Sequence, residues 1–380
     1  MQKTPYDVVF ALTGEVKRNS RALKQLRLLE RLGCRVIVVD LDDPAGSGTG
    51  VAGADLLSLG RPAGSGPRFF WEVHRRFARA LRSLDARIYH ASDLYVLPAV
   101  GRAARRRGKG FVYDARELYA FVASTAGRPW VTTFWHLYEG LFIRKADAVF
   151  TVSDSIAERL AMMYGIEKPP ALYNVPEWQE VPRTDRLREA LGLPEGRPII
   201  LHQGHLQRSR GGEKLVEAMR RVRGADLVFL GGGALRPAIE RQAQGAGIER
   251  IHFLDAVPPA ELLAFTASAD IGVTLLEDSC LNHRFALPNK LFEYLMAGLP
   301  VVGSDLPEIR RVVAENEVGE LVDASDPASI AAGLQRLVDD PERRSRCAAR
   351  ARPACETFRW EKASERYTAT YQRLLALYPS

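Results

Sequence analysis

The sequence predicts an α/β protein with two domains, each organised around a parallel β-sheet. The chain has 380 residues, too many for one ordinary hydrophobic core and enough for two domains of roughly 150–200 residues each. Short apolar strands alternate with amphipathic helices, as in βαβ units whose strands run parallel. An irregular stretch at 173–183 contains two prolines, and the alternation starts again after it.

The composition favours a globular protein of a reducing compartment. Hydrophobic residues make up 46% of the chain and charged residues 26%, as in ordinary soluble domains. No apolar run approaches the ~20 residues of a membrane span, and the start of the sequence lacks the apolar region of a signal peptide. The four cysteines are scattered and form no metal-type pair: Cys34, Cys280, Cys347 and Cys355. We therefore expect a cytoplasmic protein, with peripheral contact at the inner face of the membrane left open.

The formal net charge is +7, and much of the arginine is clustered at 75–82 and 102–109. A basic surface of this kind suits nucleic acid, anionic lipid or an acidic substrate. The sequence has no signature of a nucleic-acid-binding module, so we expect no nucleic-acid partner. A solvated helix face is the interpretation that we prefer for these clusters.

The first half of the chain begins with a βαβ unit. A strand at 7–12 precedes a leucine-rich helix at 22–32 and a second strand at 35–41. Gly14 stands at the carboxyl end of the first strand, where ligands bind in open α/β sheets. The other elements predicted in this half are helices at 69–84, 130–145 and 156–163 and strands at 87–90, 111–113 and 148–152.

Two further features of this half have competing interpretations. Asp40 and Asp42 form a D-x-D pattern typical of metal-dependent sugar transferases, but three-letter patterns arise by chance, and we expect no metal here. Glycines follow at 42–55, and we interpret that segment as a mobile surface loop. The aromatic helix at 130–145 suits either a membrane surface or packing against the sheet, and we prefer packing.

Polar side chains follow two neighbouring strands of the predicted first sheet. They are His90, Ser92 and Asp93 after one strand and Asp114, Arg116 and Glu117 after the next. Because the carboxyl ends of parallel strands share one edge, acids, a base and a hydroxyl there suggest an active-site rim. The alternatives are a packed core histidine for His90 and a helix cap for Asp114, with Glu117 three residues later.

The second half carries strands at 198–202, 225–230, 251–254, 271–274 and 301–302 with helices between them. The loop after the first of these strands holds Arg208, Arg210 and Lys214. Arginine binds phosphate oxygens as a fork, so this loop suits a pyrophosphate. Glycines at 231–233 would let a ligand approach the backbone closely.

One stretch, 280–308, concentrates the chemistry of this half. Pro288 opens a helix whose first-turn amides, at 289–291, lack intrahelical acceptors and favour a phosphate. Lys290 adds a positive charge there. Glu293, one turn further on, has a carboxylate that could accept hydrogen bonds from the two hydroxyls of a ribose. A nucleoside diphosphate would lie in this way, although a solvated Lys and Glu on an ordinary helix explain the spacing equally well.

Over nearly its whole length the chain resembles the glycosyltransferases of family 4. The most specific match is LPNKLFEYLMAGLPVVGSDLPE at 287–308, with support from NVPE at 174–177, GHLQRSRG at 204–211 and FLGGGAL at 229–235. The resemblance implies the GT-B fold, in which two Rossmann-like domains face each other across a cleft. It implies an acceptor-side domain at 1–176 completed by about 362–380, because the last helix crosses back, and a donor-binding domain at 177–361.

The same resemblance assigns roles to particular residues. Glu293 would bind the ribose hydroxyls, Arg210 would hold the diphosphate, and Gly14 would make room for donor phosphate and acceptor. His205 falls where the family often has an arginine. The full set of donor-binding residues that we expect is Gly14, Gly204, His205, Arg208, Arg210, Leu287, Pro288, Asn289, Lys290 and Glu293.

Three departures from the family pattern stand out. The position eight residues before Glu293 normally holds a second glutamate, and here it is Phe285. Serine and arginine replace histidines that relatives carry at positions 92 and 116. No family catalytic histidine is therefore carried over. Four residues remain catalytic candidates on the acceptor side by position alone: His90, Asp93, Arg116 and Glu117.

The resemblance implies retaining transfer of a sugar from a UDP- or GDP-type donor to a hydroxyl of a sugar, lipid-linked or small-molecule acceptor, with no metal cofactor. Two alternatives remain open at this point. A sugar-nucleotide 2-epimerase shares the fold, and the departures would also suit a non-catalytic protein that binds nucleotide sugars. The sequence does not indicate an oligomeric state.

Overall fold

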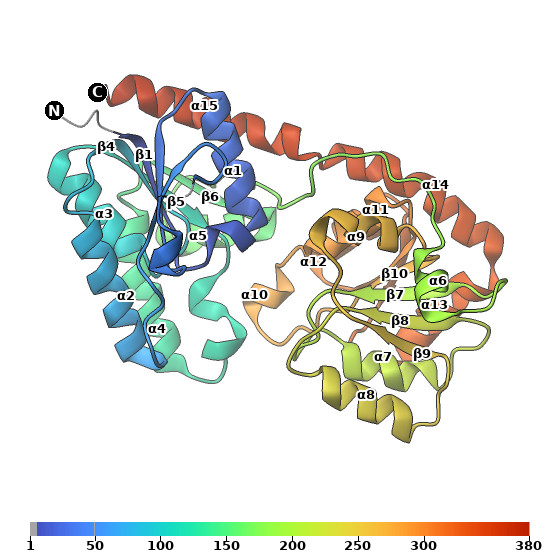
Figure 1. Ribbon diagram of the computed structural model, residues 1–380. Coiled ribbons are helices and arrows are strands. Elements are labelled where there is room, and N and C mark those ends of the chain that lie inside the picture. Colours follow the sequence, from blue (N-terminus) through green and yellow to red (C-terminus); the bar gives the residue numbers. More distant parts are fainter. Residues whose placement is uncertain (1–5, 49, 380) are drawn as a thin grey trace. The chain divides into compact units, whose positions relative to one another are not determined.

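The computed structural model describes residues 6–48 and 50–379. The chain divides into two compact units (Figure 1). Unit 1 comprises Met1–Asn174 and Glu361–Ser380, and unit 2 comprises Val175–Trp360. The first division lies within the irregular stretch at 173–183. Each unit is an α/β structure with a parallel sheet, so the predicted fold class is confirmed.

The sheet of unit 1 has six parallel strands in the order β3-β2-β1-β4-β5-β6. Their bounds are Tyr6–Ala11 (β1), Val36–Asp40 (β2), Asp55–Ser58 (β3), Ala86–Ala91 (β4), Gly110–Ala115 (β5) and Ala148–Thr151 (β6). The register pairs Val8 of β1 with Val36 on one side and Ile88 on the other. The central strands are apolar on both faces because helices cover both sides of a parallel sheet.

Helices α2, α3 and α4 form a layer on one face of this sheet, and α1 and α15 lie on the other face (Figure 1). The helices of unit 1 are Ser20–Arg31 (α1), Gly66–Ala80 (α2), Leu97–Arg107 (α3), Pro129–Ile143 (α4), Asp154–Tyr164 (α5) and the last helix, Trp360–Leu377 (α15). Four short 3-10 helices are Val16–Arg18 (η1), Pro44–Gly46 (η2), Tyr119–Phe121 (η3) and Ala123–Thr125 (η4).

The last helix of the chain packs against the first sheet, as the resemblance implied. The Tyr371 hydroxyl on α15 is hydrogen-bonded to Nδ1 of His90 at 2.6 Å, and the Tyr367 ring contacts Phe150 of β6 with centroids 5.0 Å apart. Nε of Arg87, at the start of β4, donates to the carbonyl oxygen of Tyr378 at 2.8 Å. Unit 1 is thus assembled from the two ends of the sequence.

The sheet of unit 2 also has six parallel strands, in the order β12-β11-β10-β7-β8-β9. Their bounds are Ile199–Gln203 (β7), Asp226–Leu230 (β8), Ile251–Leu254 (β9), Ile271–Thr274 (β10), Val301–Ser304 (β11) and Gly319–Val322 (β12). The helices are Arg186–Leu191 (α6), Gly212–Met219 (α7), Arg236–Gly245 (α8), Pro259–Thr266 (α9), Leu281–Arg284 (α10), Asn289–Met296 (α11), Pro307–Val313 (α12), Pro327–Asp339 (α13) and Pro341–Thr357 (α14). A core cluster joins α7, α8 and α13 to one face of the sheet through Met219, Ile239 and Leu334.

Sequence patterns and structure differ at the sheet edges and at one helix. The patterns did not predict the edge strands β3 and β12, because their sequences, DLLS and GELV, mix polar and apolar residues without a clear period. The segment interpreted as a mobile loop, 42–55, includes η2 and the first residue of β3. On α4, the preferred interpretation of core packing holds for one side of the helix only: Phe142 and Ile143 are buried, whereas Phe134 and Leu137 are exposed.

Candidate functional site

Two loops of unit 2 meet at the carboxyl ends of β7 and β8. The backbone N–H of Leu206 donates to the carbonyl oxygen of Gly232 at 2.8 Å, and that of Leu235 donates to Leu206 at 3.1 Å. Gly231 has a φ of +133° and lies against the carbonyl of Gly204, so a side chain at Gly231 would collide with backbone. Gly233, with a φ of +145°, likewise lies against the backbone of Leu206, whereas a Cβ at Gly232 would meet open space. Gly231 and Gly233 are therefore required for the close approach of the two loops, a reason for them that involves no ligand.

Three nitrogen-bearing side chains gather beside these loops. Lys290 lies in the first turn of α11, with its Nζ 3.5 Å from Nε2 of His202. Burial and the nearby Arg210 guanidinium lower the pKa of the Lys290 ammonium to about 7. Burial and Lys290 in turn lower the pKa of His202 to about 3, which keeps that imidazole neutral. The cluster of Arg210, Lys290 and His202 thus places two cationic groups and a neutral imidazole close together, and a bound anion would stabilise the two cations.

Glu293 is positioned from the end of β7. Nε2 of Gln203 donates to Oε2 of Glu293 at 2.5 Å, and Oε1 of Gln203 accepts from the Thr266 hydroxyl at 2.8 Å. The Tyr294 hydroxyl accepts from the backbone N–H of Gln203 at 3.0 Å. This network orients the carboxylate of Glu293 one turn along α11 from Lys290.

The first turn of α11 adds backbone amides to this neighbourhood. Pro288 precedes the helix and supplies no side-chain cap, although the Leu291 N–H donates to the Pro288 carbonyl oxygen at 3.1 Å. Asn289 is exposed at the tip, and Pro288 and Leu287 are half-buried. Uncapped amides at a helix N-terminus favour an anion, so the backbone adds to the attraction of the nearby cations.

The structure brings only part of the predicted donor set together. Arg210, Lys290 and Glu293 lie close together, because the charges of Arg210 and Glu293 both act on the pKa of Lys290. Gly204 lies beside it, since a Cβ there would be 3.9 Å from Cε of Lys290. His205 and Arg208 are exposed on the same loop.

The position at which the family pattern has a second glutamate lies at the end of the short helix α10. Phe285, directly after α10, is half-buried. Within the loop, the Ser279 hydroxyl is 2.8 Å from Nδ1 of His283. Burial and nearby Arg210 lower the pKa of His283. His283 therefore lies near the cationic cluster, and an aromatic side chain occupies the position of the expected carboxylate.

Sequence reasoning missed Gln203, Thr266, His202 and His283. Gln203, Thr266 and His202 come from segments whose apolar pattern predicts a strand or a helix. Only the tertiary fold brings these residues close to Glu293 and Lys290. A polar pair at the carboxyl end of an apolar strand, as in PIILHQ at 198–203, is the signal that could have identified two of them.

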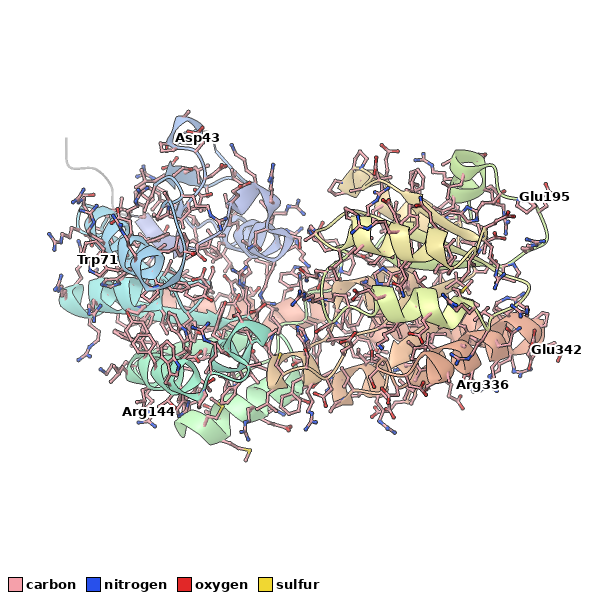
Figure 2. All side chains as sticks on the ribbon, turned by 90° about the horizontal axis from the view of Figure 1, so that it is seen from below. Asp43, Trp71, Arg144, Glu195, Arg336 and Glu342 are labelled. Atoms are coloured by element: carbon pink, nitrogen blue, oxygen red, sulfur yellow. The ribbon has the colours of Figure 1, made fainter. Side chains whose placement is uncertain are left out.

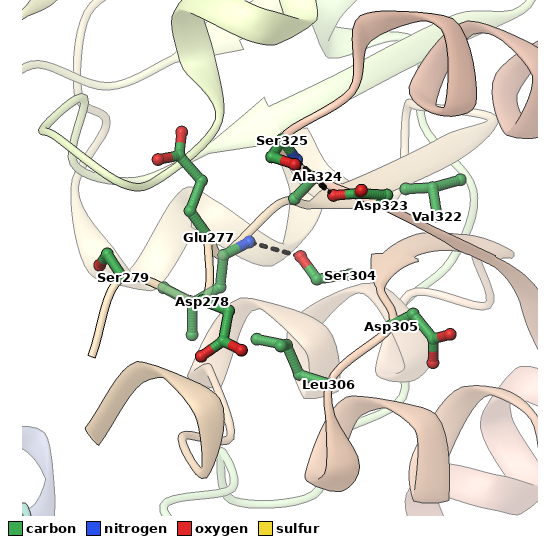
Figure 3. A pocket seen from close by; sticks show the side chains of 11 residues that line it. Glu277, Asp278, Ser279, Ser304, Asp305, Leu306, Val322, Asp323, Ala324 and Ser325 are labelled. Atoms are coloured by element: carbon green, nitrogen blue, oxygen red, sulfur yellow. Dashed lines mark hydrogen bonds between the residues drawn. The ribbon is translucent and has the colours of Figure 1, made fainter. Parts of the chain in front are cut away.

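A pocket of about 560 Å³ lies at the carboxyl ends of β10, β11 and β12 (Figure 3). Its wall carries four carboxylates, from Glu277, Asp278, Asp305 and Asp323. The backbone N–H of Leu276 donates to the Ser304 hydroxyl at 2.6 Å and ties β10 to β11. The carboxylates can accept hydrogen bonds from the hydroxyls of a polyhydroxylated ligand, and the serine hydroxyls can either accept or donate them.

In unit 1, Asp93 organises the rim that the sequence predicted. Its Oδ2 accepts from the backbone N–H and the hydroxyl of Thr13, at 2.8 and 2.9 Å. Its Oδ1 accepts from the backbone N–H groups of Tyr95 and Val96, at 3.0 and 3.2 Å. The carboxylate therefore ties the loop that bears Gly14 to the start of the segment leading into α3.

The other three catalytic candidates lie in different surroundings. Arg116 is about one-fifth exposed, with a guanidinium nitrogen 3.8 Å from Oδ2 of Asp93, and Glu117 is exposed. His90 is fully buried, stacked on Phe10 with ring centroids 4.2 Å apart. Burial lowers the pKa of His90 to about 3. These contacts favour the packed core histidine over a role at the rim.

Two aspartates have structural partners. Asp114 does not cap a helix, contrary to one interpretation of its sequence: Arg21 of α1 binds both of its oxygens, at 2.6 and 2.8 Å. Burial raises the pKa of Asp114, but Arg21 outweighs it and the net pKa is lowered. Asp40 of the D-x-D pattern is buried and accepts from the Ser58 hydroxyl at 2.7 Å and from the backbone N–H of Val16 at 3.0 Å.

Two family models match the chain in succession. Residues 19–176 match the model described as "Glycosyl transferase 4-like domain", and residues 183–353 match the model described as "Glycosyl transferases group 1". The first match lies in unit 1 except for its last residues, and the second lies wholly in unit 2.

Curated relatives are named D-inositol 3-phosphate glycosyltransferase. The protein from Xylanimonas cellulosilytica is 31% identical over 238 residues, which cover 58% of this chain and 56% of that protein. The protein from Corynebacterium glutamicum is 30% identical over 204 residues, or 51% of this chain and 47% of that protein. The chain thus spans about half the length of the curated relatives it matches.

Solved structures share the fold along nearly the whole chain. Sucrose-phosphate synthase from Thermosynechococcus elongatus superposes with a TM-score of 0.81 at 18% identity, covering 98% of this chain and 100% of that one. HepE from Anabaena in complex with UDP-glucose gives a TM-score of 0.77 at 14% identity, covering 97% and 100%. At these identities the likeness establishes the architecture of two parallel sheets with flanking helices.

Proposed function

This chain belongs to the family 4-like glycosyltransferases with the GT-B fold, and from that membership we propose its reaction. The protein transfers a sugar from a nucleoside diphosphate sugar of UDP or GDP type to an acceptor hydroxyl, with retention of anomeric configuration. Breaking the anomeric bond leaves a nucleoside diphosphate, so negative charge grows on the phosphate that departs.

The observation that carries this proposal is the cationic cluster at the tip of α11. Arg210 and Lys290 are held close enough for the first to lower the pKa of the second, at a helix end whose N-cap residue, Pro288, supplies no side-chain cap. A bound diphosphate would stabilise both cations. Because these groups neutralise the leaving diphosphate by electrostatics, the proposed reaction uses no metal.

We assign the ribose to Glu293. Its carboxylate can accept hydrogen bonds from both hydroxyls of a ribose when the diphosphate lies at the tip of the same helix. Gln203 holds the carboxylate in place by its 2.5 Å hydrogen bond, and we assign it a positioning role. Gly204, His205, Arg208, Leu287, Pro288 and Asn289 complete the proposed donor-binding surface.

We assign the acceptor side to the rim of unit 1. Asp93 positions the loop of Gly14, and the partly exposed guanidinium of Arg116 and the exposed carboxylate of Glu117 are the groups available to an acceptor. The relatives' name specifies an inositol phosphate, and Arg116 would suit a phosphate on the acceptor in the same way. We assign His90 no part in the reaction because it is fully buried.

The direct test is calorimetric titration with a panel of UDP- and GDP-sugars, followed by measurement of nucleoside diphosphate released with candidate acceptors. We expect Glu293→Gln to weaken nucleotide binding about tenfold, because a neutral amide replaces a charged acceptor. Glu261→Gln is the matched control, since that exposed glutamate on α9 pairs with Arg186 at the surface, at 2.8 Å.

Three outcomes would contradict the proposal. Failure of every nucleotide sugar to bind would remove the donor site, and unchanged affinity of the Glu293→Gln protein would make Glu293 structural. Conversion of UDP-GlcNAc to an epimer without any acceptor would indicate a 2-epimerase in place of a transferase.

A further inference from the structure

Four large apolar side chains stand exposed in a row on α4. Trp130, Phe134, Leu137 and Leu141 are 68%, 54%, 63% and 57% exposed. They are spaced four, three and four residues apart, which places them on one side of a helix from its first turn to its last. We call these four residues the α4 ridge. Single exposed apolar residues are ordinary, but a continuous row of this kind marks a surface that contacts something apolar.

The opposite side of α4 is anchored, so the helix cannot roll to hide the ridge. Glu139 is buried, and its two oxygens accept hydrogen bonds from the hydroxyls of Tyr113 and Tyr164 at 2.6 and 2.8 Å. On its flank, Trp135 packs against Phe70 of α2 with ring centroids 5.1 Å apart. The described helix thus presents the ridge as a fixed feature of unit 1.

The helices beside the ridge supply positive charge. Trp71, 63% exposed, projects from α2 (Figure 2), and the Arg102 guanidinium lies over the Phe142 ring of α4 at 5.2 Å. The other exposed cations of this layer and of the residues that flank α4 are Arg68, Arg75, Arg79, Arg82, Arg105, Arg106, Arg128, Arg144 and Lys145. Helix α3 contains no acidic residue, and the acid of α4 is the buried Glu139. On α2, Glu72 pairs with Arg75 and Arg76, at 2.8 and 3.1 Å, so these two arginines add less net charge than the others.

An aromatic ridge bordered by arginines matches the surface of an anionic bilayer. Tryptophan and phenylalanine enter the boundary between headgroups and acyl chains, while neighbouring cations attract anionic headgroups. A second copy of this chain fits less well, because a symmetric dimer through the ridge would bring two arginine-rich borders together. Within the described residues no helix is long and apolar enough to cross a membrane, so contact through α4 would be peripheral.

We propose that the face formed by α2, α3 and α4 of unit 1 docks on the surface of an anionic phospholipid bilayer. Trp135 also contacts Tyr95, which contacts Tyr119 just after Arg116, with ring centroids 5.5 and 5.7 Å apart. The docking face is thus continuous with the acceptor-side rim. Given the proposed function, on which this step rests, the acceptor is a lipid-linked molecule in the same membrane.

The test is co-sedimentation of the full chain with phosphatidylcholine vesicles, with and without phosphatidylglycerol. We expect binding only to the vesicles that contain the anionic lipid, and weakening by added salt because exposed charges are screened. Replacing all four ridge residues by Gln should reduce the bound fraction at least about tenfold. The variant Arg79→Gln/Arg105→Gln/Arg106→Gln should reduce it at low salt and lose its salt dependence.

Two matched controls separate this face from general stickiness. Arg220→Gln/Arg221→Gln/Arg223→Gln removes three exposed arginines of unit 2, and Leu377→Gln removes an exposed leucine of α15. Both should bind vesicles like the unmodified protein. Thermal unfolding and nucleotide-sugar affinity of the ridge variant should also match, which shows that it folds.

The proposal is overturned if phosphatidylglycerol does not increase binding, or if the ridge variant binds as well as the unmodified chain. It is also overturned if light scattering without lipid shows a dimer that the ridge variant dissociates, since a second copy would then cover the ridge. No donor or acceptor is present in the vesicle assay, so failure there leaves the transferase proposal standing. Failure of every nucleotide sugar to bind leaves the docking proposal standing.

Discussion

The two units share one topology, but the charged side chains at the carboxyl edge of the two sheets have different surroundings. Counting strands along the chain, each sheet runs third, second, first, fourth, fifth, sixth, so each has a switch point between its first and fourth strands where ligands bind in such folds. In unit 1 the charged groups near that edge are paired within the unit, as Asp114 is with Arg21. In unit 2 the cations Arg210 and Lys290 stand close to one another.

This difference separates a buried pair of opposite charges from two like charges that lie close together. A buried carboxylate with a guanidinium fork stabilises the contact of α1 with the sheet, and removing the guanidinium leaves a buried charge without its main partner. The Arg210 charge lowers the pKa of Lys290, and a bound anion would stabilise both cations. Unit 2 therefore carries the stronger signature of a binding site, and unit 1 contributes positioned loops. Three predictions follow from this contrast.

The largest effect is expected in unit 1. Arg21→Met leaves the Asp114 carboxylate buried with Gln25 as its remaining partner, at 2.9 Å, and should lower the free energy of unfolding by roughly 3–5 kcal/mol. Arg35→Met is the control, because Arg35 pairs with Asp55 at 3.8 Å on the surface and should cost less than about 1 kcal/mol. Urea unfolding measures both.

A double variant, Arg21→Met with Asp114→Leu, should recover part of the loss, since no unpaired charge remains. Equal destabilisation by Arg21→Met and Arg35→Met would show that the buried pair is no more important than a surface one. The buried charge pair of unit 1 would then not differ from an ordinary surface pair.

The second prediction concerns the departing diphosphate in unit 2. Arg210→Ala should lower the turnover number about 100- to 1,000-fold, the usual loss when one group that stabilises a developing charge is removed. Arg208→Ala, on the same loop but exposed, should lower it less than about tenfold. Release of nucleoside diphosphate in the presence of acceptor measures both. Similar losses of turnover for the two variants would mean that the closeness of Arg210 to Lys290 does not matter for the reaction.

The smallest effect is a pH dependence of nucleotide-sugar affinity. Lys290 has a pKa of about 7, and a bound diphosphate would raise it. Affinity is then fully present below about pH 6, where the free protein already carries the proton, and falls about tenfold by about pH 8. A nucleotide sugar is the right ligand because its diphosphate does not titrate in this range. Calorimetry at several pH values measures the change.

The matched variant for this prediction is Lys290→Arg, whose guanidinium stays charged throughout. Its affinity should vary little between about pH 6 and pH 8. If the unmodified protein shows no change either, Lys290 does not contact the diphosphate, and the cluster in unit 2 has another role.

Much of the fold could be predicted from local patterns. Most strand and helix positions follow from apolar periodicity, and the last helix, Trp360–Leu377, covers most of the range at about 362–380 that the resemblance implied. The edge strands β3 and β12 were missed because four residues of mixed polarity show no clear period. The candidate site was predictable where one helix carries it, as with Lys290 and Glu293. It was not predictable where a distant strand supplies the partner, as with Gln203.

The sequence by itself determined the class of the protein, because alternating short strands and helices and the stretch 287–308 are local properties of the chain. Only the tertiary structure decided which of the predicted polar groups are paired or packed in the core and which lie together in the candidate site. Asp114 and His90 lie near the carboxyl ends of strands and Lys290 lies in the first turn of a helix, all positions that suit catalysis. In the structure Asp114 pairs with Arg21 and His90 packs against Tyr371 of α15, whereas Lys290 lies near Arg210. The desolvation and charge pairing that make this distinction arise between segments far apart in the chain. The α4 ridge shows the same principle, since apolar residues at helical spacing predict a buried face, and only packing decides which face is left exposed.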